Sequence, residues 1–457
     1  MKPLCLLLLW ATSIASSTSS LRVVAFASAS INNYGFDHQR EAMEALLQWK
    51  SSLILLPYNN SRPLLPSWTL QMMAANRSSS NNNRCKWEGI TCNEATGVIT
   101  IISLSRMDLK VTIDILVQLP FRNFTSRTIL CLYSNGLTGS IPMSFGNLTS
   151  LTVLSLHSNS LSGSIPASFG HLTSLTILYL YTNSLSGSIP ASFGNLRSLI
   201  ELDLSDNSLT GSIPASLGNM RSLALLHLFD NSLSGSIPAS FGHLTSLTEL
   251  YLSENNLTGS ITTSLGNLTS LTILYFLSGS IPASFGNLRS LTKLDLSENN
   301  LTSSIPASLG NIRSLAILHL FDNSLSGSIL TSFGHLRSLT ELYLSENNLT
   351  GSILASFGNL RSLTELDLSE NNLTSSIPAS LGNLTSLTIL YLYSNGLTGS
   401  ILTSFGNLTS LTVLSLHSNS LSGSIPASFG HLTSLTSNWF NTYFFWKFEQ
   451  AKLLTPV

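Results

Sequence analysis

The chain has 457 residues, enough for several globular domains or for one long array of repeats. Charged residues make up 9% of it, and 21 basic residues nearly balance 22 acidic ones. Because a nucleic-acid-binding surface needs an excess of positive charge, this balance argues against a nucleic-acid partner.

Residues 1–29 have the features of a secretory signal peptide. Lys2 precedes an apolar run, 4–10, that is too short to span a bilayer, and small-x-small cleavage patterns follow at 25–27 and 27–29. No other stretch approaches the roughly 18 apolar residues that a spanning helix needs. We therefore expect a secreted protein with no direct membrane span in this chain.

The segment 37–98 differs in pattern from everything that follows it. The sequence "EAMEALLQWKSSL" (41–53) is amphipathic at helical spacing. Its apolar face consists of Ala42, Ala45, Leu46, Trp49 and Leu53. The sequence "CKWEGITC" (85–92) then places Cys85 and Cys92 beside Trp87. Because a solenoid needs a polar cover over its first coil, we expect 37–98 to form an N-terminal cap.

Residues 99–436 are built from a 24-residue repeat, exemplified by "LTVLSLHSNSLSGSIPASFGHLTS" from Leu151. Its first leucine recurs as Leu175, Leu199, Leu223, Leu247, Leu271, Leu291, Leu315, Leu339, Leu363, Leu387 and Leu411. A fixed period of this size predicts a solenoid in which each coil buries its apolar face against its neighbours.

Within a repeat, Leu154 and Leu156 alternate with polar or smaller residues, which predicts a short strand with one buried face. Stacked coils then form a parallel sheet. Asn159 recurs in nearly every repeat, where its amide can bond the backbone of adjoining coils. Phe169 recurs as a buried spine, with leucine as its substitute. The repeat at 271–290 is four residues short and lacks the asparagine, so we expect a kinked or strained coil there.

The consensus "LxxLxLxxNxLxGxIPxxhGNL" resembles the plant-type leucine-rich repeat, and the preceding cap resembles that of plant receptor-like kinase ectodomains. The resemblance implies an α/β solenoid, a right-handed leucine-rich-repeat superhelix with a parallel β-sheet on its concave face and an N-terminal helical cap. It also implies a Cys85–Cys92 disulfide. The implied function is extracellular recognition of a peptide, protein or wall-derived ligand on the concave sheet, together with a co-receptor ectodomain.

Catalytic and metal-binding patterns are weak. His227 lies one coil from Asp203 and serines are abundant, but no nucleophile elbow accompanies them. The strand histidines lie on different coils, several of them too far apart to share a metal ion. Kinase signatures are absent from the sequence. We therefore expect no enzyme activity, no metal and no cofactor.

The exposed positions of the strands predict the ligand site. One column reads Tyr179, Asp203, His227, Tyr251, Tyr275, Asp295, His319, Tyr343, Asp367 and Tyr391, and beside it stand Tyr181, Phe229, Phe321 and Tyr393. An acidic column that includes Glu254 and Glu346 precedes the recurrent asparagine. Aromatic anchors and acids suit a basic or polar peptide. The alternative is that these acids are ordinary residues of the repeat consensus, and that their charges are solvated and screened by salt.

Glycosylation signals of the N-x-[ST] type avoid the strands of the repeats. The candidate asparagines are Asn76, Asn123, Asn147, Asn256, Asn267, Asn300, Asn348, Asn372, Asn383 and Asn407. Glycans there would crowd the flank and back of the solenoid and leave the concave sheet bare, as a ligand surface requires.

Residues 437–457 form an atypical aromatic tail, either a cap over the last coil or a boundary that truncated a receptor gene. Cys131 is the odd thiol, expected at an exposed strand position. The chain is expected in the apoplast, or at the plasma membrane if a full-length parent carries a transmembrane helix. The alternative function is a secreted protein similar to polygalacturonase inhibitors, which blocks a cell-wall-degrading enzyme; a decaying duplicate without function is a third possibility.

Overall fold

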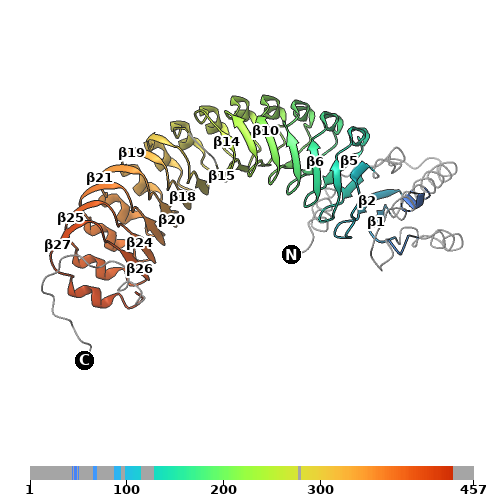
Figure 1. Ribbon diagram of the computed structural model, residues 1–457. Coiled ribbons are helices and arrows are strands. Elements are labelled where there is room, and N and C mark those ends of the chain that lie inside the picture. Colours follow the sequence, from blue (N-terminus) through green and yellow to red (C-terminus); the bar gives the residue numbers. More distant parts are fainter. Residues whose placement is uncertain are drawn as a thin grey trace, which may run out of the picture. The chain divides into compact units, whose positions relative to one another are not determined.

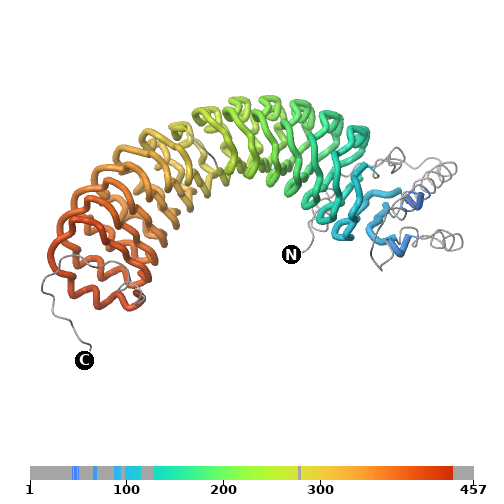
Figure 2. The backbone as a smooth tube through the Cα atoms, in the orientation of Figure 1, coloured from blue at the N-terminus to red at the C-terminus, as the bar shows by residue number. Residues whose placement is uncertain are grey.

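The computed structural model describes residues 44, 46–48, 50, 65–68, 87–93, 98–114, 128–275 and 279–435. The predicted signal peptide, the tail, Cys85, Asn76 and Asn123 lie outside these residues. The chain divides into two compact units, residues 1–207 (unit 1) and 208–457 (unit 2). In both units the backbone makes one coil per repeat (Figures 1 and 2).

Unit 1 contains a main sheet in which β1 and β2 are antiparallel and all later neighbours are parallel. Its strands, in spatial order, are β1 (Ile90–Cys92), β2 (Ile99–Ser103), β3 (Thr128–Cys131), β5 (Leu151–Ser155), β7 (Ile177–Tyr179) and β9 (Glu201–Asp203). Leu154 and Leu156 are fully buried, as expected, but Val153, Ser155 and His157 are buried as well, so this coil does not show the expected alternation. The alternation is seen in β9, where the central Leu202 is buried and its two neighbours are partly exposed.

Unit 2 continues the pattern with a parallel main sheet. Its strands, in spatial order, are β11 (Leu225–His227), β13 (Glu249–Tyr251), β15 (Ile273–Tyr275), β16 (Lys293–Asp295), β18 (Ile317–His319), β20 (Glu341–Tyr343), β22 (Glu365–Asp367), β24 (Ile389–Tyr391) and β26 (Val413–Ser415). Corresponding residues of successive repeats pair directly, so that each sequence column is also a column in space.

A second set of strands lies on the flank of the coils, which the sequence did not predict. In unit 1 these are β4 (Thr138–Ser140), β6 (Ser160–Ser164) and β8 (Ser184–Gly187); in unit 2 they are β10 (Ser208–Ser212), β12 (Ser232–Gly235), β14 (Asn256–Leu257), β17 (Thr302–Ser304), β19 (Ser324–Ser328), β21 (Asn348–Ser352), β23 (Asn372–Ser376), β25 (Gly396–Ser400) and β27 (Ser420–Ser422). Within unit 2, β18, β20, β24 and β26 lie on the inner side of the bend and β19, β21, β25 and β27 on the outer side (Figure 1).

Short 3₁₀ helices close each coil. They are η4 (Met143–Asn147), η5 (Ala167–His171), η6 (Ala191–Asn195), η7 (Ala215–Asn219), η8 (Ala239–His243), η9 (Thr263–Asn267), η10 (Ala283–Asn287), η11 (Ala307–Asn311), η12 (Thr331–His335), η13 (Ala355–Asn359), η14 (Ala379–Asn383), η15 (Thr403–Asn407) and η16 (Ala427–His431). A proline precedes most of them, because its fixed φ suits the entry to a helix and its missing N–H is not needed there. Most of these helices carry a phenylalanine, and those from η4 to η15, such as Phe169 and Phe357, are buried, which confirms the predicted spine there. Phe429 of η16 is only partly buried.

The recurrent asparagine bonds adjoining coils, as the sequence predicted. The Nδ2 group of Asn347 donates to the backbone oxygens of Leu320 at 2.8 Å and Ser345 at 3.0 Å. Its Oδ1 atom accepts from the backbone N–H of Leu325 at 2.9 Å. The same pattern recurs at Asn323 and elsewhere, so one amide satisfies backbone groups of two coils.

The short repeat changes the flank and leaves the main sheet intact. β15 and β16 pair in register, with Ile273 opposite Lys293. On the flank, the sheet that contains β14 ends and the sheet that starts at β17 is separate, with only an isolated bridge between Gly279 and Leu301. The predicted kink stays a prediction.

Two tryptophans pack against each other in the described part of the cap. Trp68 and Trp87 stack with ring centroids 5.1 Å apart, and the Trp68 indole N–H donates to the Glu88 backbone oxygen at 2.9 Å. The Lys50 ammonium donates to the backbone oxygens of Leu65 and Trp68. None of the helices in the described part of the chain combines the length and hydropathy needed to cross a membrane.

The cysteines differ in part from the expectation. Cys92 and Cys131 are both disulfide-bonded. The pairing of Cys92 with Cys85 stays a prediction, because Cys85 lies outside the described residues. The expectation that Cys131 is an exposed odd thiol is wrong, since its side chain is fully buried and its sulfur is in a disulfide.

Candidate binding surface on the parallel sheet

The outward side chains of the main sheet of unit 2 form the candidate surface. They are the first and third residues of strands β11 to β26 and the residue two positions after each strand, and we call them the sheet face of unit 2. Strand pairing places His227 beside Tyr251, Tyr251 beside Tyr275, and His319 beside Tyr343. The structure therefore brings together neighbouring members of the predicted column.

The first half of this face is an aromatic cluster. The His227 ring meets the edge of Tyr251 at 4.4 Å between centroids, and Tyr251 stacks on Tyr275 at 4.6 Å. Phe229 packs beside both His227 and Tyr251. The ammonium group of Lys293 lies 4.9 Å from the centre of the Tyr275 ring, a cation–π contact. This face thus already accommodates one cation on an aromatic ring.

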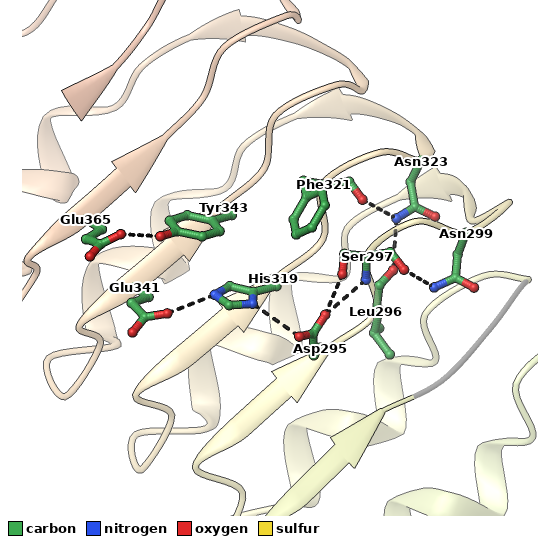
Figure 3. A network of polar contacts seen from close by, with 10 residues as sticks. All are labelled: Asp295, Leu296, Ser297, Asn299, His319, Phe321, Asn323, Glu341, Tyr343 and Glu365. Carbon is green, nitrogen blue, oxygen red and sulfur yellow. Dashed lines mark hydrogen bonds and ion pairs between the residues drawn. The ribbon is translucent and has the colours of Figure 1, made fainter. Parts of the chain in front are cut away.

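The second half is centred on His319, which lies between two carboxylates (Figure 3). Its Nδ1 atom is 3.2 Å from Asp295 Oδ2 and its Nε2 atom is 3.0 Å from Glu341 Oε2. The imidazole also stacks on Tyr343, with 4.5 Å between centroids and 5° between ring planes. The Tyr343 hydroxyl donates to the carboxylate of Glu365. Four successive coils, those of β16, β18, β20 and β22, are therefore linked through side chains as well as through the sheet.

Serine hydroxyls hold two of the aspartates. Ser297 donates to Asp295 Oδ1 from its hydroxyl at 2.6 Å and from its backbone N–H at 3.3 Å. Ser369 makes the same two bonds to Asp367, at 2.5 and 2.9 Å. Sequence reasoning missed these serines as site residues, although the recurring order "DLS" was the available signal. The bonds fix each carboxylate against its own strand.

Burial and neighbouring charge set the protonation of this face. Burial raises the pKa of Asp295, but hydrogen bonds from His319 and Ser297 outweigh it and hold that pKa below its usual value. Burial, followed by the Glu249 carboxylate, raises the pKa of Tyr251 to about 12. Burial and the hydrogen bond to a glutamate also raise the pKa of Tyr343. The phenols therefore stay protonated donors at any physiological pH.

An acidic border lies in the turn that follows these strands. In six coils of unit 2 the third residue after the main-sheet strand is acidic and has a left-handed backbone, with φ between 50° and 55° at Asp230, Glu254, Glu298, Asp322, Glu346 and Glu370. We call this row the border turn. Some desolvation raises the pKa of Glu346, and the carboxylates of Glu370, Asp322, Asp367 and Glu298 raise it further. The carboxylates of the border turn therefore repel one another.

Unit 1 presents a more closed version of the same face. His157 stacks between Tyr133 at 4.5 Å and Tyr181 at 4.2 Å, and it is only 9% exposed. Burial lowers the pKa of His157 to about 4; Asp203 opposes this shift and Arg106 adds to it. Asp203 itself accepts from the hydroxyl of Ser205 at 2.6 Å.

The prediction of Tyr179 as an exposed ligand residue is wrong. The side chain of Tyr179 is buried because its ring packs against Val153 and Ile177 and its hydroxyl donates to Glu201. Tyr181 remains partly exposed beside it.

The glycosylation signals that the structure describes lie away from the main sheets. Four of these asparagines end 3₁₀ helices: Asn147, Asn267, Asn383 and Asn407. Three begin flank strands, Asn256, Asn348 and Asn372, and Asn300 lies two residues before β17. All eight side chains are exposed. Their positions match the expectation, whereas glycosylation itself stays a prediction.

Metal chemistry finds no support in the described ranges, where no three His, Cys, Asp or Glu side chains are grouped to hold a metal ion. Asp295, His319 and Glu341 of Figure 3 form a chain of polar contacts along the sheet, and these contacts are ion pairs when the imidazole is protonated. Histidine between two carboxylates can donate from both ring nitrogens when protonated. The arrangement suits recognition of a polar partner through fixed donors and acceptors.

The fold and the repeat define a leucine-rich-repeat solenoid. A family model described as "Leucine rich repeat" matches residues 128–185, 337–397 and 385–437, and a second with the same description matches 198–220, 222–244, 246–268, 290–312 and 314–336. A model described as "Leucine rich repeat N-terminal domain" matches residues 42–93. These matches cover more than half of the chain, which belongs to the leucine-rich repeat family.

Plant receptors are among the similar proteins. The leucine-rich repeat receptor-like serine/threonine-protein kinase RGI4 of Arabidopsis thaliana is 40% identical over 98 residues, which are 21% of this chain and 7% of that protein. The crystal structure of PEPR1-AtPEP1 matches at a TM-score of 0.71 and 32% identity, covering 87% of this chain and 57% of the other. That of a TDR receptor matches at 0.62 and 32%, covering 73% and 62%. This chain therefore spans a small part of the kinase and under two thirds of each receptor chain.

Proposed function

We propose that this chain is the extracellular ligand-recognition module of a plant receptor of the leucine-rich-repeat type, and that it binds an extended peptide on the sheet face of unit 2. The observation that carries the proposal is the row of partly exposed tyrosine, histidine and acidic side chains along β11 to β26. Such residues are typical anchors of protein–peptide interfaces, because they combine apolar area with polar atoms.

The position of the glycosylation signals supports the same face. All eight described asparagines are exposed on the flank or the helices, so attached glycans would leave the main sheet accessible. Similarity to plant receptors with the same fold adds to this. We further propose that residues 1–29 are a signal peptide, that 37–98 form a cap with a Cys85–Cys92 disulfide, and that the module acts in the apoplast with a co-receptor ectodomain.

The test is capture of peptides from plant apoplastic fluid by the immobilised protein, followed by mass spectrometry. Tyr251→Ala and Tyr343→Ala should each weaken the captured peptide's affinity by about 30-fold, the scale of a lost aromatic anchor. Met143→Ala is the control, because this side chain is 73% exposed and lies off the main sheet. Equal capture by all variants would refute the proposed face. A fungal polygalacturonase mixed with the protein should keep its activity; its inhibition would favour the alternative function.

A further inference from the structure

In the described part of unit 2, residues 208–275 and 279–435, the charges are sorted by position. Every acidic residue between 208 and 435 lies either on a strand of the main sheet or in the border turn. The sheet carries Glu249, Asp295, Glu341, Glu365 and Asp367, and the border turn carries the six acids named above. The flank strands and 3₁₀ helices of unit 2 contain no aspartate, glutamate, lysine or arginine.

Positive charge on the same face is nearly absent. Lys293 is the one lysine or arginine on the main sheet of unit 2, and its ammonium group lies over the ring of Tyr275. Arginines such as Arg313 and Arg361 stand in the turns that lead into the strands, at the edge opposite the border turn. The face therefore has a negative edge, a middle of aromatic and acidic side chains, and a positive edge.

From this sorting we infer that the ligand of the sheet face of unit 2 is a cationic peptide, with lysine or arginine side chains directed to the border turn. The inference rests on the proposed function and names the class of its ligand. Carboxylates in a row repel one another, and a cation held among them relieves that repulsion while gaining charge-assisted hydrogen bonds. Tyrosine rings beside the row add cation–π sites of the kind that Lys293 already occupies.

The border turn is more available to such a ligand than the acids on the strands. Asp295 and Glu341 are engaged with His319, and Glu365 accepts from Tyr343. Glu346 and Glu370 are exposed side chains on the edge of the face, and Glu370 also has a side-chain hydrogen bond with Tyr393. Strands spaced about 4.8 Å apart over this sheet match an extended peptide of about 12 residues, at about 3.3 Å per residue.

The experiment is selection of a phage-displayed random library of peptides about 12 residues long on the intact chain, with binding of the enriched peptides then measured. Enriched peptides should carry an excess of at least two lysines or arginines over the unselected library. A Glu346→Gln/Glu370→Gln double variant should bind them about fivefold or more weakly, because two charge pairs are lost. The same variant should unfold no more easily than the parent chain, since it removes repulsion.

Asp114→Asn is the matched control, an exposed acid in unit 1 that lies off this face. Peptides that bind through Tyr343 but show no excess of basic residues would overturn the inference and leave the proposed function standing. Enriched peptides that bind all variants equally and dissociate between about 50 and 300 mM salt would show non-specific attraction, which also overturns it. Failure to enrich any peptide that depends on Tyr343 would refute the proposed function itself.

Discussion

Removing the side-chain amide of one recurrent asparagine tests how neighbouring coils are held together. Asn347 is 7% exposed, and its amide is the shared partner of backbone groups in two coils. Asn347→Ala removes the acceptor of the Leu325 N–H and a donor to the Leu320 oxygen. The side chains of both leucines are fully buried, so water does not easily replace the lost partner.

The size of the expected destabilisation follows from the number of backbone groups that lose this amide as a hydrogen-bond partner. A buried backbone group that loses its partner costs about 1–3 kcal/mol, and each net hydrogen bond is worth about 1 kcal/mol. With one backbone N–H and at least one carbonyl affected, Asn347→Ala should lower the free energy of unfolding by about 2–5 kcal/mol. The loss should be local, because each coil of a solenoid contacts only its neighbours.

Two measurements together decide this prediction. Urea unfolding followed by far-UV circular dichroism gives the loss of stability, and amide hydrogen exchange shows whether β18 and β20 open first. Asn359→Ala is the control, because Asn359 is exposed, has the same side chain and lies outside any glycosylation signal. A loss below about 0.5 kcal/mol, or one equal to that of the control, would refute the reasoning from buried backbone groups.

Four further predictions address packing, backbone strain and pH. Gly358→Ala should destabilise the folded chain by about 1–3 kcal/mol, because a Cβ there would lie 2.4 Å from a backbone oxygen of the next coil. Gly430→Ala is the control and should be tolerated, because nothing lies within 4 Å of a Cβ at that position. Equal shifts of the melting temperature in the two variants would contradict this. Ser375→Gly should raise stability by about 0.5–1 kcal/mol, because this exposed serine has φ of 71° where other coils use glycine; an unchanged melting temperature would show no strain. The pKa of Asp295 is lowered in the folded chain, so Asp295→Asn should lower the free energy of unfolding above about pH 4. The difference in stability between variant and parent should shrink as pH falls below that value. A difference that stays constant with pH would contradict the stabilisation of the Asp295 carboxylate by its partners. The pKa of His157 is lowered by burial to about 4, so the parent should lose about 3 kcal/mol as pH falls from about 6.5 to 4, a component that His157→Phe should lack in acid-unfolding curves.

The main sheet could be predicted from sequence because its signals repeat. Alternating leucines such as Leu226 and Leu228 specify one buried face, and the recurrence of Asn159 at the same place in the repeat specifies the row of asparagines that join the coils. Because the repeats have the same length and consensus, residues at equivalent positions of successive repeats lie side by side in the structure. Local periodicity and stacking therefore demand the same arrangement, which is the condition for a reliable inference.

The flank strands escaped prediction because their stabilisation comes from the next coil. The sequence "SLSGS" (160–164) alternates with a single buried residue, Leu161, and serine and glycine have low strand propensity. Pairing with the neighbouring flank strand supplies the backbone bonds that the residues themselves do not favour. The requirement for glycine in the 3₁₀ helices could not be predicted from sequence either. Glycine is needed there because the next coil approaches its Cα closely, as at Gly358.

Contacts on the sheet face depend on which residue stands in the next repeat. Tyr251 and Tyr343 occupy equivalent positions, yet only Tyr343 donates to a glutamate, Glu365. The corresponding neighbour of Tyr251 is Ile273, and this ring stacks on the next tyrosine instead. A column read from the sequence gives the members of the surface, but the pairs within it follow from the neighbours on both adjoining strands and from rotamers.

The acids of the border turn are not required by the fold. The left-handed backbone that they adopt is also adopted by Ser394 and Ser418, with φ of 51° and 53°. A neutral residue therefore satisfies the same turn without the repulsion that raises the pKa of Glu346. Stability alone would favour serine in every coil, whereas six coils of unit 2, from that of Asp230 to that of Glu370, keep a charge that opposes folding. Residues that oppose stability while lining an accessible face are expected where binding compensates them, which is the physical reason for assigning the border turn to a cationic ligand.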